Sequence, residues 1–414
     1  MNSDIDEEIE RKIKRYNQEH LLNYYYKLEE GNIKNQFKKQ LENINFELID
    51  NLYRNTNKQE KNETDKIEPI EYWDKERLGG KYDFYEEIGE KAIKSGKLAT
   101  VTMAGGQGTR LGHNGPKGTF DIGLDSHKSL FELLCDGIKE ASKKYRVNIP
   151  WFIMTSRENN KETVDFFKRN KYFGYEKNIY FFIQGELPMV DTEGKILIGE
   201  NGLIKEAADG HGGVYESLVK SGMVKKMKSL GVEWVFIGGV DNCLVRMVDP
   251  VLMGLAIYKG VTGAGKSVVK ASPKENVGVF CKKNMKPNVI EYTEITPEMA
   301  EARDDAGELL YGESHILCNL FSISAIERMG SSPLPYHTAF KKATYIDADG
   351  NTVVPTSPNA YKFEAFLFDA FSDLDDMVVL RVKREEEFAP VKNATGSDSP
   401  ETARELYKNF HKLS

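Results

Sequence analysis

The segment that most constrains this chain is residues 98–118, LATVTMAGGQGTRLGHNGPKG, where an apolar run ends in a glycine-rich loop. The apolar run predicts a buried strand, and the loop after it carries two cations, Arg110 and Lys117. Glycines permit positive φ angles and close approach of a ligand, so exposed amide groups can point at phosphate oxygens. The segment therefore predicts a binding site for a polyphosphate, with the two cations supplying charge.

The sequence after about residue 82 is typical of an α/β fold. Helices are predicted near 83–95, 128–145, 157–170 and 214–230, and strands at 98–103, 149–154, 179–183 and 234–238. This alternation implies βαβ units and a mainly parallel sheet, whose ligands bind at the carboxyl ends of the strands. Shorter and more polar strands, which predict a mixed sheet or a small β-rich subdomain, follow at 267–270, 277–282, 288–293, 315–323 and 377–383.

The first 54 residues are highly charged and are predicted to be helical. After Gly31, which is expected to separate two helices, apolar residues recur in a single helical stripe: Ile33, Phe37, Leu41, Ile44, Leu48 and Leu52. Residues 55–70 are polar and predict a linker or a mobile loop.

Composition excludes several classes of protein. The chain has 57 Lys and Arg against 64 Asp and Glu, and a net charge of −7 argues against a dedicated nucleic-acid binder. The four cysteines form no CxxC pair, so neither a zinc site nor a disulfide framework is expected. With no apolar signal segment and no run of about 18 apolar residues, we expect a soluble cytoplasmic protein that does not bind membranes.

Two other motifs compete with the glycine loop as nucleotide sites. A dinucleotide fingerprint fails, because counting GxGxxG from Gly106 puts Leu111 where the last glycine should be. Residues 260–267, GVTGAGKS, match the phosphate-loop pattern of NTPases, which requires a strand before the loop and a helix after it. Here a helical pattern precedes the motif and β-branched residues follow it, so a helix-to-strand turn is the favoured interpretation and an ATPase the alternative.

Eight further motifs follow the glycine loop in order. They are QGELPMV (184–190), DGHGGVYESL (209–218), VDNCLVRMVDP (240–250), NVGVF (276–280), EYTEI (291–295), CNLF (318–321), NAYKFEAFLFD (359–369) and REEEFAPVKNATGSDSPETAR (384–404). Together with AGGQGTRLG and PKG, they resemble the eukaryotic-type UDP-N-acetylhexosamine pyrophosphorylases, a family of UDP-sugar pyrophosphorylases, over about residues 85–410. The combination is specific, although no single motif is.

The resemblance implies both a reaction and a fold. UTP and a sugar 1-phosphate would give a UDP-sugar and pyrophosphate, assisted by Mg²⁺. The implied fold is a nucleotidyltransferase α/β fold, Rossmann-like and GT-A-like, with a mixed central sheet flanked by helices. We expect an N-terminal helical segment and linker (1–75), a catalytic domain (76–345) and a small α+β C-terminal part (346–414) that closes the site. The protein would be a monomer or a weak homo-oligomer.

The resemblance also implies roles for particular residues. Lys117, Arg110 and Lys362 would stabilise charge on the phosphates, and Asp241, after the strand WVFIGGV, would hold Mg²⁺. The expected nucleotide contacts are Ala104, Gly105, Gly106, Gln107, Gly108, Gln184 and Gly210. The expected sugar contacts are His211, Gly212, Glu291 and Asn319. Asp249 is expected to cap a helix instead.

Each of these residues also has a structural interpretation. Gln184 suits a uracil edge because its side-chain amide both donates and accepts hydrogen bonds, and a capping or turn glutamine is the less favoured alternative. Asn319 lies in an apolar run, so either a ligand or a neighbouring backbone group must satisfy its side-chain amide.

One residue departs from the family pattern. His211 stands where the family usually has asparagine in DGNGG, which leaves the sugar open between an N-acetylhexosamine and glucose. The expected activity is uridylyl transfer to N-acetylglucosamine 1-phosphate. The alternatives are a glucose 1-phosphate or broad-range enzyme and a catalytically inactive UDP-sugar-binding protein.

Overall fold

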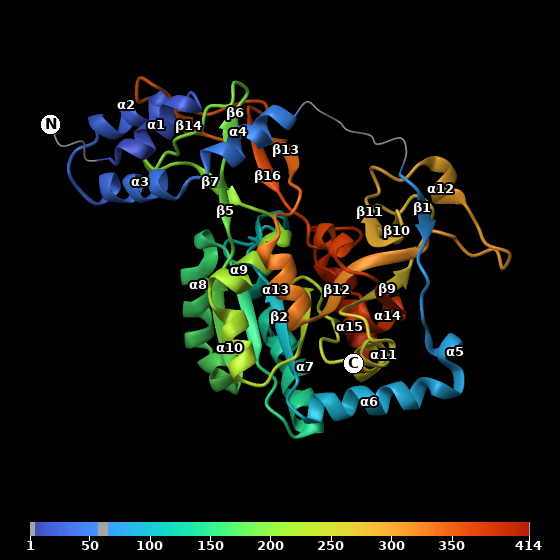
Figure 1. The fold of residues 1–414 in the computed structure, drawn as a ribbon. Coiled ribbons are helices and arrows are strands. Elements are labelled where there is room, and N and C mark those ends of the chain that lie inside the picture. Colours follow the sequence, from blue (N-terminus) through green and yellow to red (C-terminus); the bar gives the residue numbers. More distant parts are fainter. Residues whose placement is uncertain (1–4, 57–64, 414) are drawn as a thin grey trace. The chain divides into compact units, whose positions relative to one another are not determined.

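The computed structural model describes residues 5–56 and 65–413 (Figure 1). The chain divides into two compact units. Unit 1 comprises residues 1–63, 185–212 and 335–366, and unit 2 comprises residues 64–184, 213–334 and 367–414. Both units are discontinuous, unlike the sequential parts expected with boundaries at 75 and 345, because two inserted segments share an apolar core with the N-terminal helices.

Unit 2 is built on a mixed ten-stranded sheet. Its central strands run parallel in the order β8, β2, β3, β4, with bounds Trp234–Gly239, Leu98–Met103, Trp151–Thr155 and Ile179–Ile183. Strands β2 and β3 are buried throughout, which explains their continuous apolar sequence. Their carboxyl ends meet at one edge, which is where ligands bind in such sheets.

The other six strands complete the same sheet, so the first of the two expected arrangements, a mixed sheet, is confirmed. Strand β12 is antiparallel to both β8 and β9, and β17 is parallel to β9. Strands β10 and β11 form a hairpin whose turn places Asn284 and Met285 at positive φ. The bounds are β1 Ile67–Pro69, β9 Gly263–Val269, β10 Val279–Lys283, β11 Lys286–Ile290, β12 Glu313–Ser322 and β17 Val378–Arg381.

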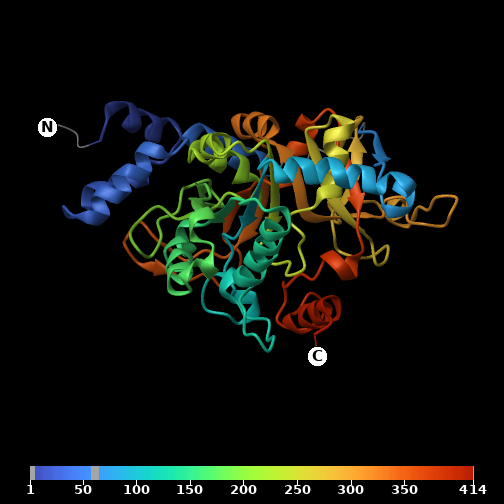
Figure 2. The same cartoon turned by 90° about the horizontal axis from the view of Figure 1, so that it is seen from below.

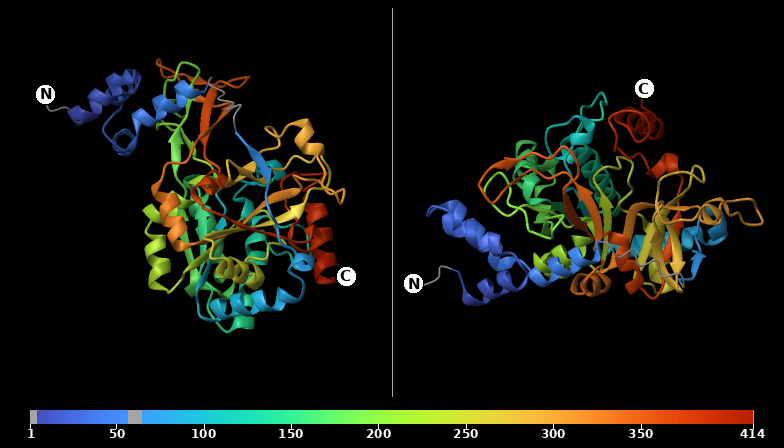
Figure 3. Two further views of the ribbon diagram at one scale, coloured as in Figure 1. Left: turned by 45° about the vertical axis from the view of Figure 1, so that its right-hand side comes forward. Right: turned by 90° about the horizontal axis from the view of Figure 1, so that it is seen from above.

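The helices of unit 2 cover the sheet. Helices α6 and α11 cross closely (Figure 2). The crossing requires glycine at two positions, because a Cβ on Gly89 or Gly254 would lie 1.8 Å from a backbone oxygen of the other helix. Helices α9, α10 and α13 lie together beside the sheet (Figure 3). The bounds are α5 Lys75–Leu78, α6 Tyr82–Lys94, α7 Leu130–Tyr145, α8 Arg157–Arg169, α9 Val214–Lys220, α10 Met223–Ser229, α11 Pro250–Lys259, α12 Pro297–Glu301, α13 Ile323–Ser331, α14 Arg384–Glu387 and α15 Pro400–His411.

Unit 1 joins four N-terminal helices to short antiparallel strands. The helices are α1 Glu7–Arg15, α2 Glu19–Lys27, α3 Asn32–Asn43 and α4 Phe46–Asn55. The strands are β5 Glu186–Pro188, β6 Val190–Asp191, β7 Glu206–Ala208, β13 His337–Lys341, β14 Tyr345–Ile346, β15 Thr352–Val353 and β16 Ala360–Glu364. Helical side chains such as Phe37 and Leu41 share one core with Val190, Ile198 and Phe363 from the inserted segments.

Three expectations about local structure need correction. The single stripe after Gly31 is split between α3 and α4, because the Asn45 side chain accepts a hydrogen bond from the Leu48 amide and starts a new helix. The helix predicted at 214–230 breaks before Gly222, which adopts φ +76°. Strand β9 starts at Gly263, so it contains most of the region interpreted as a turn.

The start of α3 after Gly31 is confirmed. Of the linker predicted at 55–70, residues 57–64 lie outside the described residues, and 67–69 form β1. Among the residues that the structure describes, no helix is both long and apolar enough to cross a membrane.

Candidate active site

The glycine loop begins directly after β2, and its two arms are joined by backbone hydrogen bonds. The Ala104 amide donates to Met154 O at 2.8 Å, which continues the pairing of β2 with β3. Further along, Gly108 N donates to Gly115 O at 2.9 Å and Lys117 N to Gly106 O at 3.1 Å. These bonds form a short antiparallel ladder, whose turn needs the positive φ of +69° at Gly112.

The first amides of the loop remain available to a ligand. Among the described residues, the N–H groups of Gly105, Gly106 and Gln107 have no hydrogen-bond acceptor, and Gly106 is exposed. The buried side-chain oxygen of Gln107 likewise has no hydrogen-bond partner there. Successive free amides at the carboxyl end of a parallel strand form an anion-binding surface.

Two glycines of the loop are required by their neighbours. A Cβ on Gly105 would lie 2.6 Å from Oε1 of Gln184, so the structure brings these two predicted nucleotide contacts together. A Cβ on Gly108 would lie 2.8 Å from the His113 side chain. Gln184 follows β4 and is buried, and its backbone N–H donates to Thr155 O at 2.7 Å.

The side chain of Asn159 supports the glycine loop, and this residue was not predicted from the sequence. Its Nδ2 donates to Ala104 O at 2.9 Å and to Gly106 O at 3.3 Å. The same side chain forms a capping box with Ser156 at the start of α8. A serine followed three residues later by a residue that can cap, directly after a buried strand, was the available signal.

The structure brings Lys117 and Asp241 together, but loosely. Lys117 Nζ lies 3.5 Å from Asp241 Oδ2, and the two side chains are 18% and 26% exposed. Asp241 follows β8, and a Cβ on Gly239 would lie 2.7 Å from its Oδ1, so glycine leaves room for the carboxylate. Arg110 lies in an exposed 3₁₀ turn and has no ion-pair partner among residues 5–56 and 65–413.

The donor set around Asp241 fits Mg²⁺ only together with a substrate. No group of three or more His, Cys, Asp or Glu side chains in the described part of the chain could hold a metal ion. Mg²⁺ keeps several waters and is commonly bound by one or two carboxylates together with phosphates. Asp241 is partly exposed and follows β8, the strand that pairs in parallel with β2, so it can supply such a carboxylate at the edge where the free amides also lie.

The two predicted sugar contacts of unit 2 have protein neighbours. Asn319 is fully buried on β12, and its side-chain Nδ2 lies 3.2 Å from His315 Nε2. Its partner in the structure is therefore a side chain, and not the backbone group or ligand that was expected. His315, four residues earlier on the same strand, was not predicted from the sequence. Glu291 follows β11, and a Cβ on Gly278 would lie 3.3 Å from its Oε1.

The other predicted contacts lie in unit 1. Gly210 has φ +88°, and a Cβ there would lie 2.3 Å from Ala365 O, while the Gly212 amide donates to the same oxygen at 2.9 Å. The His211 ring stacks on Phe366 with a centroid distance of 5.4 Å. Lys362 pairs with Glu364 at 2.7 Å. The DGHG segment and the strand carrying Lys362 are therefore neighbours within this unit.

The phosphate-loop-like motif is structural. Gly260 ends α11 at φ +68°, and Lys266 points into the protein from β9 and is fully buried. Its Nζ lies 2.7 Å from Asp249 Oδ2 and also pairs with Glu387. Asp249 caps α11 by accepting from Val251 N at 2.9 Å, as predicted. The arrangement is helix, then strand, so it lacks the geometry of an NTPase loop.

Burial and these charges shift the pKa values of the cluster. Burial alone would raise the pKa of Asp249, but Lys266 and Arg246 outweigh it and lower the pKa to about 2. Burial raises the pKa of Glu387, and Lys266 offsets only part of that shift. Burial would lower the pKa of Lys266, but its two carboxylate partners raise it.

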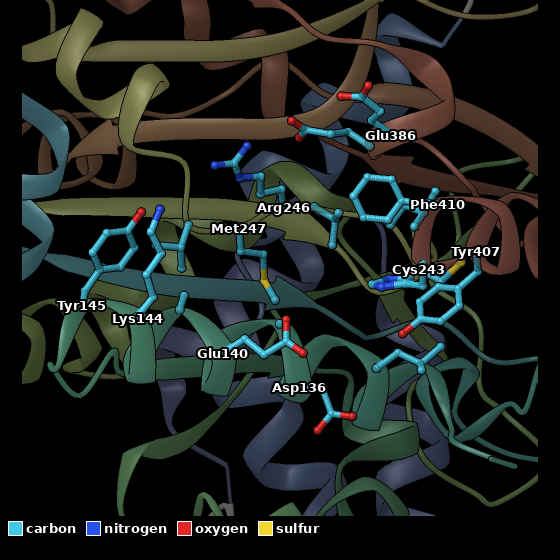
Figure 4. Close-up of a pocket in the computed structure, with 18 residues that line it drawn as sticks. Asp136, Glu140, Lys144, Tyr145, Cys243, Arg246, Met247, Glu386, Tyr407 and Phe410 are labelled. Carbon is cyan, nitrogen blue, oxygen red and sulfur yellow. The ribbon is translucent and has the colours of Figure 1, made fainter. Parts of the chain in front are cut away.

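A separate cavity of about 400 Å³ lies within unit 2 (Figure 4). Lys144 and Tyr145 border it from α7, Arg246 and Met247 from the segment after Asp241, and Phe410 from α15. Its cations are Lys144 and Arg246, and its carboxylates are Asp136, Glu140, Glu386 and Glu387. This excess of negative charge makes the cavity a poor host for a triphosphate.

Comparison with known proteins identifies the family. The family model described as UTP--glucose-1-phosphate uridylyltransferase matches residues 43–404. The chain is 39% identical over 339 residues to the human UDP-N-acetylhexosamine pyrophosphorylase-like protein 1, covering 79% of this chain and 67% of that protein. It is 39% identical over 336 residues to the UDP-N-acetylglucosamine pyrophosphorylase of Saccharomyces cerevisiae, covering 78% and 70% of the two chains.

A solved structure agrees with this assignment. The uridine diphosphate N-acetylglucosamine pyrophosphorylase of Trypanosoma brucei, crystallised with an inhibitor, matches with a TM-score of 0.83 at 32% identity. The match covers 96% of this chain and 83% of that chain. The chain therefore belongs to the UTP--glucose-1-phosphate uridylyltransferase family, among its UDP-N-acetylhexosamine pyrophosphorylase relatives.

Proposed function

We propose that this protein transfers the uridylyl group of UTP to a sugar 1-phosphate, with N-acetylglucosamine 1-phosphate as the substrate. The observation that carries the proposal is the row of free amides at Gly105, Gly106 and Gln107, in a family whose relatives are UDP-sugar pyrophosphorylases. The amides would bind the triphosphate, and Gln184, beside Gly105, would contact the uracil edge.

In the proposed reaction, a phosphate oxygen of the sugar 1-phosphate attacks the α-phosphorus of UTP. The new O–P bond forms as the bond from the α-phosphorus to the bridging oxygen breaks, and pyrophosphate leaves with that electron pair. Such a transfer depends on positioning and charge neutralisation rather than on a covalent enzyme intermediate. Lys117 and Arg110 would stabilise the charge that accumulates on the leaving pyrophosphate.

The remaining predicted roles stay proposals. Asp241 would hold Mg²⁺, which when bound neutralises phosphate charge and orients the oxygens. Gly210 is proposed to contact the nucleotide and Lys362 a phosphate. The proposed sugar contacts are His211, Gly212, Glu291 and Asn319. The described cysteines are all free and buried, which supports a reducing compartment such as the cytoplasm. A monomer or a weak homo-oligomer is proposed.

A panel of sugar 1-phosphates tests the activity. Purified protein, UTP and Mg²⁺ are combined with N-acetylglucosamine, N-acetylgalactosamine or glucose 1-phosphate, and pyrophosphate release is measured. We expect the fastest release with N-acetylglucosamine 1-phosphate. A preference for glucose 1-phosphate would support the alternative suggested by the description of the family model. Binding of UDP-sugar without pyrophosphate release from any sugar would support an inactive binding protein.

Replacing the proposed metal ligand tests its role separately. Asp241→Asn keeps the size of the side chain but removes its charge, so Mg²⁺-dependent turnover should fall while metal-free UTP binding stays unchanged. Calorimetric titration with UTP, with and without Mg²⁺, measures both quantities. An unchanged Mg²⁺ requirement would remove Asp241 as a ligand.

A further inference from the structure

The Asp241 carboxylate lies on a segment that other parts of the chain hold tightly. Its own ion pair is loose, because Lys117 Nζ is 3.5 Å away. The backbone at Asp241 and just after it is fixed instead: Val391 N donates to Asp241 O at 2.9 Å, and Cys243 N donates to Ala389 O at 3.2 Å. The position of this carboxylate therefore depends on residues 387–391, which lie far away in the sequence.

Asn242 links these two segments. Its Nδ2 donates to Glu387 O at 2.7 Å, and its Oδ1 accepts from Ala389 N at 2.9 Å and from Leu244 N at 3.2 Å. The side chain is 4% exposed, so water cannot easily replace these bonds. The nitrogen and oxygen of one buried side-chain amide thus join the segment after β8 to the end of α14 and to the residues that follow it.

The buried ion cluster anchors the same two segments. Lys266 pairs with the Glu387 carboxylate and with Asp249, and its Nζ also donates to Arg246 O at 3.1 Å. Lys266 therefore contacts the chain on both sides of the Asn242 bonds. Arg246 and Glu387 also border the cavity of Figure 4, so this side of the network adjoins the cavity.

We propose that Asn242 is a positioning residue for Asp241, and that Lys266 supports it by holding Glu387. This inference rests on the proposed function, because it assigns to Asp241 the binding of Mg²⁺ with UTP. Neither Asn242 nor Lys266 touches the reacting groups; both act by fixing the backbone that carries the carboxylate. The lysine of the phosphate-loop-like motif thus serves the proposed active site indirectly.

The test measures metal-dependent nucleotide binding as well as turnover. In Asn242→Ala, the Mg²⁺ concentration for half-maximal pyrophosphate release should rise by ~10- to 100-fold, the range for residues that orient a metal ligand. Calorimetry should show that Mg²⁺ no longer strengthens UTP binding as it does in the wild type, while metal-free UTP affinity is unchanged. Glu387→Gln, which weakens the link to Lys266, should cause a smaller shift in the same direction.

A second asparagine provides a matched control. Asn359 in unit 1 accepts from Ala343 N at 2.8 Å and donates to Ala343 O at 3.0 Å, so it also bridges backbone groups. Asn359→Ala should lower thermal stability without changing the Mg²⁺ dependence. If Asn242→Ala does not fold, Asn242→Ser and Glu387→Gln provide the same readouts.

The outcomes separate this inference from the proposed function. A wild-type Mg²⁺ dependence in folded Asn242→Ala and Glu387→Gln, or an equal shift in Asn359→Ala, would overturn the positioning role. If the wild type releases no pyrophosphate with any sugar but Mg²⁺ strengthens its UTP binding, the proposed function fails while calorimetry still tests Asn242. If Mg²⁺ has no effect on wild-type UTP binding, the inference is overturned.

Discussion

Two segments of this chain that resemble nucleotide-binding motifs combine glycines with a lysine, but one lysine is partly exposed and the other is fully buried. In residues 104–118, the glycines leave amides free and Lys117 is partly exposed beside Asp241. In residues 260–267, Gly263 and Gly265 lie in β9, where a Cβ would lie 2.5 Å from Leu374 or 2.7 Å from Phe280. Lys266 is fully buried between two carboxylates. A match of letters to a motif is therefore informative only together with the elements on either side.

The sharpest test of this contrast is Lys266→Met. The substitution removes the cation that pairs directly with the buried carboxylates of Asp249 and Glu387 and leaves only Arg246 nearby, and breaking a buried pair in this way costs about 3–5 kcal/mol. Urea unfolding should show a loss of that size. A stability equal to that of the wild type, or ATP hydrolysis by the wild type that this variant abolishes, would contradict the structural role.

Lys117→Ala should do the reverse. The lysine is partly exposed and its ion pair is long, so unfolding should change little. Loss of a cation that stabilises the leaving group should slow pyrophosphate release by ~10²–10³-fold, by analogy with oxyanion-hole donors. Single-turnover kinetics beside urea unfolding measures both effects. A stable but fully active variant would exclude Lys117 from catalysis.

Gly108→Val tests the loop through its backbone. The new side chain would collide with His113, 2.8 Å from the Cβ, and displace the loop while leaving the core untouched. UTP affinity should fall by ~100-fold, equivalent to about 2.7 kcal/mol. Calorimetry gives the affinity, and circular dichroism serves as the control for folding. The matched change Gly260→Val, at the end of α11, should leave UTP binding intact.

The smallest expected effect is a pH dependence of the buried cluster. Because the pKa of Asp249 is lowered from 3.8 to about 2, its carboxylate stabilises the fold above pH 3.8, and this contribution is lost as the pH falls towards 2. The stability difference between the wild type and Asp249→Asn should therefore narrow by about 2 kcal/mol between pH 5 and pH 2. Urea midpoints across that range measure it, and a constant difference would contradict the assigned pKa.

The features that the sequence predicted well are local. An apolar run followed by glycines indicates a strand and its loop within twenty residues, so the position of the loop at the end of β2 could be predicted. The capping role of Asp249 was also predicted, from the residues next to it in the sequence. The order of helix and strand around residues 260–267 was predictable for the same reason.

The features that the sequence did not predict depend on long-range contacts. Asn242 and Glu387 are 145 positions apart, so no periodicity connects them. The support of the loop by Asn159 crosses 55 positions. Even the partner of Asn319, only four residues away, was missed, because a change of pairing register between His315 and Asn319 makes simple strand alternation unreliable there.

The shared core of unit 1 has a practical consequence for truncated versions of the protein. Val190, Ile198 and Phe363 are covered in part by α1–α4, although they lie far from these helices in the sequence. A version that starts at residue 65 would keep the inserted strands but expose their apolar side chains to solvent. Such a trimmed protein is expected to self-associate, so crystallisation trials should retain the first four helices.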